Sequence, residues 1–211
     1  MANNDNNNKN NINIYSPIDK VILEAAMQEM LLRINLLRRH EIALGLTDPV
    51  EHVKGRIKSE KSMVEKLIRK NYPVNAESAF SMVKDAVGIR IVCMFVDDVY
   101  RLVDVLKNQG DLNVVKEKDY IKNPKANGYR SYHIIVKLPV HLVNEVRLVF
   151  VEIQIRTIAM DTWASLEHQL KYKHNIKNQE LIVDELKRCA SELASTDLSM
   201  QMIQQMIEAE E

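Results

Sequence analysis

Apolar residues near the start of the chain recur at the spacing of a helix. The run extends from Ile18 to Leu37, and its period of three to four residues predicts an amphipathic helix. Ser16 and Pro17 supply an N-cap and a proline in the first turn, and Gly45 supplies a stop signal. The chain therefore opens on one long helix.

Short β-branched and apolar runs predict four strands further along the chain, at about 87–95, 112–118, 131–138 and 146–155. Further helices are predicted at about 59–71, 97–107, 157–173 and 179–208. Asp97 is the expected cap of the second of these, and the last could be one helix or two. If residues 55–58 are also extended, the sheet has about five strands. This order is typical of the α/β (α+β) class, with a mixed sheet flanked by helices.

The N-terminus differs in composition from the rest of the chain. Its first thirteen residues include eight asparagines and almost no apolar side chains, so they cannot bury enough surface to offset the entropy of ordering. We expect a disordered tail over residues 1–15 and a globular domain over 16–175. Residues 176–211 are expected to form C-terminal helices.

Charge is balanced overall but unevenly distributed. Residues 54–70 carry seven basic and two acidic side chains, and residues 180–211 carry eight acidic and two basic ones. The basic middle favours an anionic ligand there, although solvated helix faces would give the same pattern.

Composition narrows the function classes. The net charge of zero argues against nucleic acid as the main partner. No run approaches the ~18 apolar residues of a membrane span. Nothing at the N-terminus resembles a signal peptide, and the two cysteines show no metal or disulfide spacing. We expect a cytoplasmic protein.

Two acidic residues are placed where chemistry could occur. Asp85 stands just before the strand at about 87, where a carboxylate can hold Mg²⁺ together with phosphates. Glu152 lies in VEIQIRT, and alternation places Glu152, Gln154 and Arg156 on one face of that strand. A solvated loop aspartate and a half-exposed edge strand would look the same.

The segment DYIKNPKANGYRSYH, residues 119–133, combines two turn signals with cations and aromatic rings. Lysines such as Lys125 can meet phosphate, and Tyr129 offers a face on which a base can stack. An ordinary basic hairpin loop is the alternative.

These segments together resemble a known family. DAVGIRIV, DYIKNPKANGYRSYH and VEIQIRTIAMDTWASLEHQLKYK are similar to the synthetase domain of the RelA/SpoT superfamily, and the length resembles its short branch, the small alarmone synthetases. The resemblance covers roughly residues 50–173. It implies a nucleotidyltransferase-like synthetase fold and transfer of pyrophosphate from ATP to the 3′-hydroxyl of GMP, GDP or GTP.

The resemblance also implies roles for individual residues. Asp85 and Glu152 resemble the acids that bind Mg²⁺, the implied cofactor, and carry catalysis. The residues that resemble ATP contacts are Arg56, Lys58 and Arg90. The residues that resemble contacts to the acceptor guanine nucleotide are Lys118, Lys125, Asn127, Tyr129, His133 and Gln154.

Comparison with the family pattern leads to three further expectations. No His-Asp dipeptide of the family's hydrolase domain occurs, so we expect synthesis without degradation. The C-terminal helices resemble those that build a homotetramer, and the alternative is that they only cover their own sheet. Asp161 stands where relatives often carry an amide, and its charge should repel an alarmone, so we expect weak or no activation by one.

Two other functions remain open from the sequence. A nucleotidyltransferase acting on RNA or a small molecule would usually show a Gly-Ser motif, which is absent. A non-catalytic nucleotide- or RNA-binding regulator could use the same basic pocket.

Overall fold

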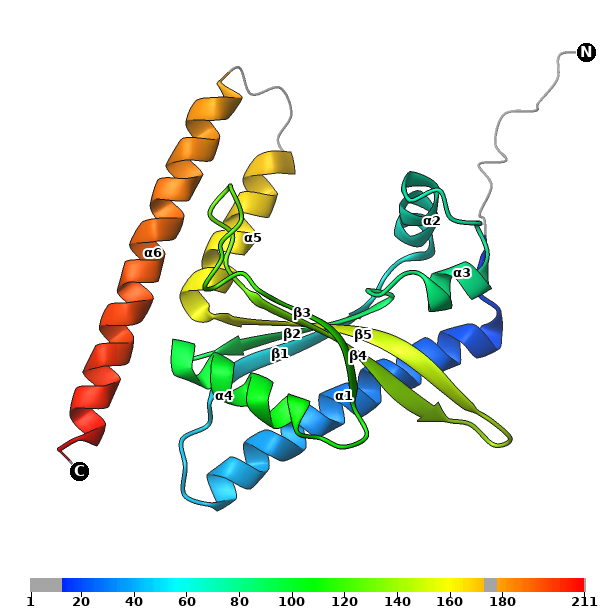
Figure 1. Cartoon of the computed structure of the whole chain (residues 1–211), viewed down its shortest axis with the longest axis horizontal. Coiled ribbons are helices and arrows are strands. Elements are labelled where there is room, and N and C mark those ends of the chain that lie inside the picture. The colour runs from blue at the N-terminus through cyan, green and yellow to red at the C-terminus, as the bar shows by residue number, and fades with distance from the viewer. Residues whose placement is uncertain (1–12, 173–177, 211) are drawn as a thin grey trace, which may run out of the picture.

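The computed structural model describes residues 13–172 and 178–210 of the chain, with six helices and one five-stranded sheet (Figure 1). In chain order the elements are α1 (Pro17–Ala43), β1 (Val50–Ile57), α2 (Glu60–Arg69), α3 (Ala76–Ser81), β2 (Val87–Cys93), α4 (Val96–Lys107), β3 (Asn113–Asp119), β4 (Tyr132–His141), β5 (Val146–Thr157), α5 (Ile158–Tyr172) and α6 (Gln179–Glu208).

The sheet is mixed, as the sequence predicts. Its strand order is β1-β2-β5-β4-β3, and only the central pair, β2 and β5, is parallel. Helices α1 and α4 cover one face, whereas α5 with α6 and α2 with α3 rise at opposite ends of the other face (Figure 1). Because α1 and α4 cover one face of the sheet, we expect functional side chains on the opposite face (Figure 1).

Alternation along the central strands separates the core from the polar face. Ile89, Ile153 and Ile134 are at most 1% exposed and lie next to one another on β2, β5 and β4. Burying an isoleucine side chain fully is favourable by about 1.5–3 kcal/mol. The core between the sheet and α1 therefore fixes which strand residues face the other way.

Two elements give little signal in the sequence pattern. Strand β1 is exposed along most of its length, and a polar edge strand carries little hydrophobic signal. Helix α3 has six residues, too few to show a helical period. At the C-terminus the structure has one 30-residue helix, α6, and not the pair that the pattern left open.

Two predicted boundaries are wrong. Asp97 does not cap α4. The cap residue is Phe95, and its N–H donates to Asp98 at 3.2 Å. The expected tail over 1–15 ends too late, because Tyr15 is buried against Phe80 with the ring centroids 5.9 Å apart. Residues 1–12 of that tail lie outside the described residues.

Within the described ranges, no helix combines the length and the apolar character that crossing a bilayer requires.

Candidate active site

Side chains on the polar face form a row that crosses all five strands. Lys54, Arg90, Gln154, His133 and Lys118 are consecutive cross-strand partners on β1, β2, β5, β4 and β3. Residues directly opposite each other in a sheet point to the same side. Four predicted site residues and Lys54, which was counted only in the basic run, are thus placed side by side by strand register.

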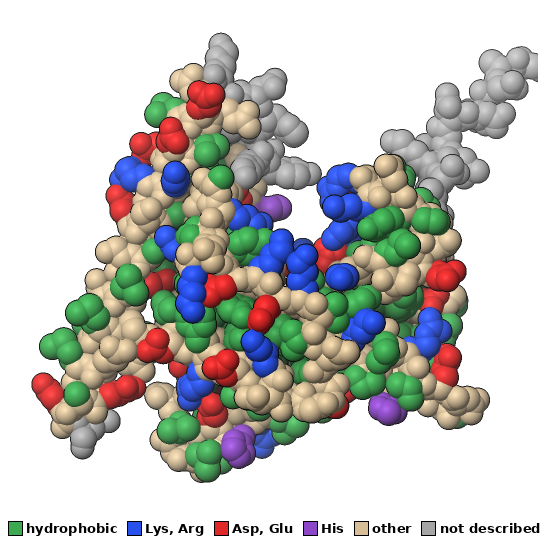
Figure 2. Space-filling model, in the orientation of Figure 1, with side chains coloured by type: hydrophobic (Ala, Val, Ile, Leu, Met, Phe, Trp, Pro, Cys, Tyr) green, Lys and Arg blue, Asp and Glu red, His purple; other side chains and the backbone are tan. Residues whose placement is uncertain are grey.

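A second row, one pleat away, consists of Arg56, Gly88 and Glu152. The two rows border a pocket of about 230 Å³, and Asp85, at the entrance to β2, also lines it. Lys and Arg side chains gather around this hollow between the α2 and α5 ends of the molecule (Figure 2). Asp85 and Glu152, which are far apart in sequence, meet at one cavity.

The Asp85 carboxylate has one occupied and one open oxygen. Its Oδ2 lies 3.2 Å from Nζ of Lys58 and 2.7 Å from Nζ of Lys66. Its Oδ1 is buried and has no hydrogen-bond partner. A buried oxygen without a partner is unfavourable unless a ligand satisfies it. Lys66 escaped the sequence prediction because its only signal was membership of the basic run.

Glu152 is held as a carboxylate. The Gln154 amide donates to Oε2 at 3.0 Å, and Nδ1 of His133 lies 3.7 Å from Oε1. Burial by itself would raise the pKa of Glu152, but His133, Gln154 and the nearby Lys66 together hold that pKa below its ordinary value. A group that stays ionised at neutral pH suits charge stabilisation and metal binding better than strong base catalysis.

The two acids fit a divalent cation that also binds substrate. No cluster of three or more His, Cys, Asp or Glu suited to a metal occurs among the described residues. Mg²⁺ commonly takes one or two carboxylates and completes its shell with phosphates and water. The open Oδ1 of Asp85 and the ionised Glu152 match that need.

Two arginines, one on β1 and one on β2, line the pocket together. Arg56 is the cross-strand partner of Gly88, and a Cβ built at Gly88 would lie 3.6 Å from Cγ of Arg56. Both residues line the pocket. Arg90, two residues further along β2, is 37% exposed at its side chain. Lys58 contacts Asp85 and is placed at the edge of the same pocket.

In and around the loop between β3 and β4, cations and rings form one cluster. Nζ of Lys125 lies 4.7 Å from the ring centre of Tyr129 and 4.8 Å from that of Tyr120. Lys118 donates to the Tyr120 hydroxyl at 3.0 Å. Asn127 instead donates its side-chain amide to Glu167 on α5, at 3.0 Å. Tyr120 was not among the predicted site residues.

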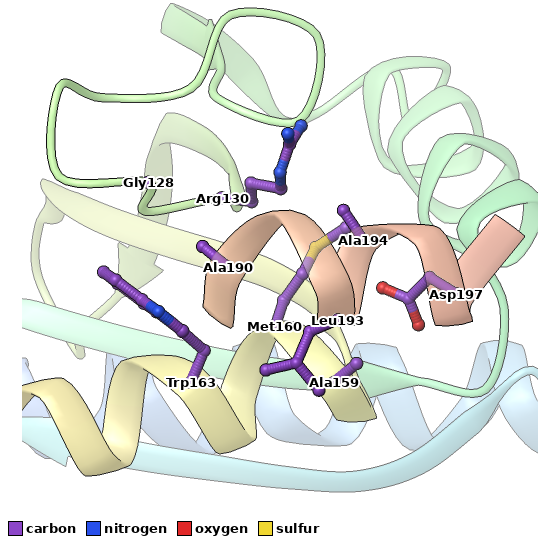
Figure 3. Close-up of a pocket in the computed structure, with 9 residues that line it drawn as sticks. All are labelled: Gly128, Arg130, Ala159, Met160, Trp163, Ala190, Leu193, Ala194 and Asp197. Carbon is purple, nitrogen blue, oxygen red and sulfur yellow. The ribbon is translucent and has the colours of Figure 1, made fainter. Parts of the chain in front are cut away.

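Helix α6 packs against the loop that carries Tyr129 (Figure 3). The indole N–H of Trp163 on α5 donates to the Leu186 carbonyl at 2.8 Å. Gly128 has φ +91°, and a Cβ there would lie 2.7 Å from Cβ of Ala190. Contact this close leaves room only for glycine at position 128. The packing of α6 therefore requires a glycine at this turn of the loop.

A substitution at Gly128 tests this packing. Gly128→Ala should lower the free energy of unfolding by about 1–3 kcal/mol, because both the positive φ and the contact oppose a side chain. Urea denaturation measures the change. Adding Ala190→Gly should recover the steric part, and Gly110→Ala, which meets nothing within 4 Å, is the control. A Gly128→Ala protein as stable as the original would contradict the account.

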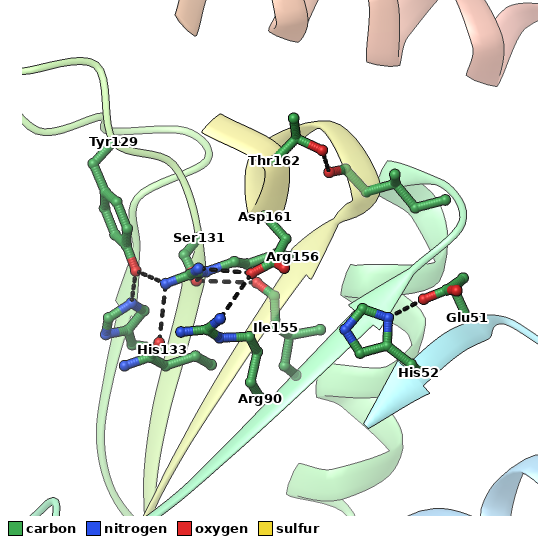
Figure 4. A network of polar contacts seen from close by, with 12 residues as sticks. Glu51, His52, Arg90, Tyr129, Ser131, His133, Ile155, Arg156, Asp161 and Thr162 are labelled. Atoms are coloured by element: carbon green, nitrogen blue, oxygen red, sulfur yellow. Dashed lines mark hydrogen bonds and ion pairs between the residues drawn. The ribbon is translucent and has the colours of Figure 1, made fainter. Parts of the chain in front are cut away.

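Arg156 is the centre of the polar network (Figure 4). It is 4% exposed. Its Nη2 donates to the Tyr129 hydroxyl at 2.6 Å and to Oε1 of Gln154 at 3.0 Å, and its Nη1 donates to Asp161 at 2.9 Å. The Tyr129 hydroxyl is also 2.8 Å from Nε2 of His133. Alternation placed Arg156 on this face, but its central position was not predicted.

Asp161 is also engaged within this network. It contacts Arg156 and lies 3.3 Å from Nη1 of Arg90. Two guanidinium groups offset its charge, so the expected repulsion of an alarmone by Asp161 loses its basis. Weak activation by an alarmone stays a prediction.

Comparison with known proteins agrees with this geometry. The family model described as "Region found in RelA / SpoT proteins" matches residues 55–177. The chain is 50% identical over 143 residues to the GTP pyrophosphokinase YwaC of Bacillus subtilis, which covers 68% of each chain. It is 43% identical over 147 residues to the GTP pyrophosphokinase YjbM of the same organism, covering 70% of this chain and 68% of the relative.

Solved structures show the same fold. The small alarmone synthetase 1 from Bacillus subtilis, bound to its product pppGpp, aligns with a TM-score of 0.80 and 35% identity, over 89% of this chain and 95% of that one. The small alarmone synthetase 2 from Bacillus subtilis aligns with a TM-score of 0.79 and 40% identity, over 88% and 97%.

Proposed function

We propose that this chain, which belongs to the RelA/SpoT family, is a GTP pyrophosphokinase. It transfers the β,γ-diphosphate of ATP to the ribose 3′-hydroxyl of a guanine nucleotide, and it releases AMP and an alarmone of the (p)ppGpp type. The observation that carries the proposal is the pair of cross-strand rows. They bring a basic half, Arg56 and Arg90, and His133 to opposite sides of Glu152. Tyr129, whose hydroxyl is 2.8 Å from Nε2 of His133, completes an aromatic half.

The reaction is a displacement at phosphorus. The acceptor 3′-oxygen forms a bond to the β-phosphorus of ATP, and the bond from that phosphorus to the α-phosphate oxygen breaks. AMP leaves with that oxygen, and the proton of the 3′-hydroxyl is released to water. Such transfers depend on positioning and on neutralising charge. Arg56 and Arg90 hold the adenine and Lys58 meets the phosphates, which offsets the charge that develops on AMP.

The acceptor occupies the aromatic half. Its guanine stacks on Tyr129, whose orientation is fixed by hydrogen bonds at the hydroxyl. Lys118 and Lys125 meet the 5′-phosphates as point charges. Lysines on flexible stems can hold one, two or three phosphates, so GMP, GDP and GTP are all candidate acceptors.

Glu152 lies where the two halves meet, so we propose that its carboxylate accepts the hydrogen bond of the 3′-hydroxyl and orients it for attack. Its pKa below the ordinary value keeps it charged throughout the physiological range. Asp85 and Glu152 would hold Mg²⁺, which, when bound, neutralises the donor phosphates.

A product assay tests the proposal directly. The full chain is incubated with ATP labelled at the β-phosphate, Mg²⁺ and each guanine nucleotide in turn, and the products are separated. We expect label in a guanosine 3′-diphosphate and unlabelled AMP in equal amount. Retention of single-stranded RNA at physiological salt without any transfer would favour a non-catalytic regulator. A nucleotidyltransferase would instead extend added RNA with unlabelled AMP and release the label as pyrophosphate.

We also propose a homotetramer that acts in the cytoplasm. Five apolar residues of α6 are candidates for the interface, and they divide into two groups. Leu186 and Leu193 pack against the chain's own Trp163 cluster, whereas Leu181, Leu198 and Ile203 are about half exposed or more. Together with Met202 and Met206, at 63% and 65% exposure, Leu198 forms an outward stripe on α6. The two cysteines are free thiols, which suits a reducing compartment.

The outward stripe can be tested in the full chain. Leu198→Lys combined with Met202→Lys should reduce the mass measured by light scattering, because charged side chains oppose burial in an interface. Thr196→Lys, on the same helix but off the stripe, is the matched control. An unchanged mass in the double variant would remove the stripe from the interface.

A further inference from the structure

The carboxylate of Asp161, at the start of α5, lies between two guanidinium groups from different strands (Figure 4). Oδ1 of Asp161 accepts a hydrogen bond from Nη1 of Arg156 at 2.9 Å and lies 3.3 Å from Nη1 of Arg90. The Asp161 side chain is 17% exposed, so water screens these charges only in part.

The two arginines belong to different halves of the pocket. Arg90 lines the donor side together with Arg56. Arg156 does not line that cavity but donates to the Tyr129 hydroxyl at 2.6 Å, on the acceptor side. Asp161 is the described residue that contacts both guanidinium groups.

The two positive charges oppose each other. Burial and the neighbouring Arg156 lower the pKa of Arg90, and Asp161 acts in the opposite direction. Arg156 is fixed by further bonds to Gln154 and Tyr129, whereas Arg90 is 37% exposed and makes the longer of the two contacts with Asp161, at 3.3 Å. Arg90 is therefore the partner that a nucleotide can draw away from Asp161.

We propose that Asp161 is a positioning residue that couples the donor and acceptor sides. It pairs with Arg90 on the donor side while ATP is absent, and through Arg156 it holds Tyr129 on the acceptor side. The inference rests on the proposed function. When ATP binds, Arg90 turns onto the adenine and leaves the Asp161 carboxylate to Arg156 alone. The Arg156 pair tightens, Tyr129 is held more firmly, and the guanine nucleotide binds better. Linkage requires the same gain for ATP when the guanine nucleotide binds first.

The experiment measures this coupling without turnover. The dissociation constant of GDP is determined by titration calorimetry, with Mg²⁺, in the absence and presence of saturating α,β-methylene-ATP, in which the bond that would break is replaced. In the unaltered chain we expect GDP to bind about fivefold more tightly when the analogue is present. Asp161→Asn keeps an oxygen for Arg156 but removes the charge, and the ratio should fall to near one.

Two further variants separate coupling from folding. Asp161→Glu restores the charge and should restore most of the ratio, which a purely structural role of the side chain would not predict. Asp111→Asn removes a surface carboxylate paired with Arg33 and should leave the ratio unchanged. If Asp161→Asn does not fold, Arg90→Lys tests the link from the other end, since an ammonium cannot bridge as a guanidinium does, and the ratio should again fall.

The outcomes are distinct. The coupling by Asp161 is overturned if the ratio of GDP dissociation constants is near one in the unaltered chain. It is also overturned if the ratio stays full in folded Asp161→Asn or in Arg90→Lys. In these cases the proposed pyrophosphokinase activity still stands if the unaltered chain transfers label. Failure of the unaltered chain to transfer label overturns the proposed function itself.

Discussion

Glu152→Gln should abolish turnover, a loss of at least about 10³-fold in kcat, while ATP binding is largely kept. Glutamine preserves the shape of the side chain and its contact with Gln154, but it removes the charge that orients the acceptor hydroxyl and holds Mg²⁺. The loss should appear in kcat because the proposed mechanism brings the reacting groups together at Glu152. The proposed adenine contacts are instead Arg56 and Arg90, on β1 and β2. Initial rates and ATP titration together measure the two effects.

A matched control for this variant lies on the same hairpin. Glu145→Gln removes a carboxylate at the β4–β5 turn, where Glu145 pairs only loosely with Arg147 at 3.6 Å. It should leave kcat unchanged. Transfer at a near-normal rate by Glu152→Gln would show that the central carboxylate has been assigned the wrong role.

Arg156→Met should both destabilise the protein and impair use of the acceptor. Removing one partner from a buried ion pair typically destabilises by about 3–5 kcal/mol, because the other charge is left without its counter-ion. Here Asp161 would lose its closer partner, and the Tyr129 hydroxyl and Gln154 would each lose a donor. We expect kcat/KM for the guanine nucleotide to fall about 10²-fold or more, as for the loss of a positioning group at a reacting centre.

Urea denaturation and initial rates with varied GDP measure these two losses. Arg38→Met is the comparison, because Arg38 pairs with Asp48 at 2.7 Å with its side chain 24% exposed, and a partly solvated pair contributes less. An Arg156→Met protein with the original urea midpoint would mean that the network around Tyr129 adds nothing to stability.

Alternation and turn signals predicted part of the candidate site from the sequence alone. Period two places Glu152 and Gln154 on one face of β5, and the turn-rich segment before β4 predicts a loop that presents Tyr129. The resemblance to the RelA/SpoT synthetases named the same residues. What alternation cannot supply is the partner strand, so the cross-strand row from Lys54 to Lys118 became visible only with the register.

The missed residues share a physical reason. Arg156 has the local pattern of a solvated strand residue, and its burial depends on α5 and on the loop at Tyr129, which come from other parts of the chain. Lys66 is one cation among several on α2, and only the fold brings it to Asp85. The packing of α6 on Gly128 likewise depends on residues about sixty positions apart.

The hydrogen bond from Trp163 to the Leu186 carbonyl has a practical consequence. Trp163 is the single tryptophan of the chain, it is 5% exposed, and its ring centre lies 6.4 Å from that of Tyr129. Fluorescence excited selectively at the indole therefore reports on the contact between α6 and the loop that carries Tyr129. If a nucleotide binds at Tyr129, a change in Trp163 fluorescence would show whether its binding alters the contact with α6.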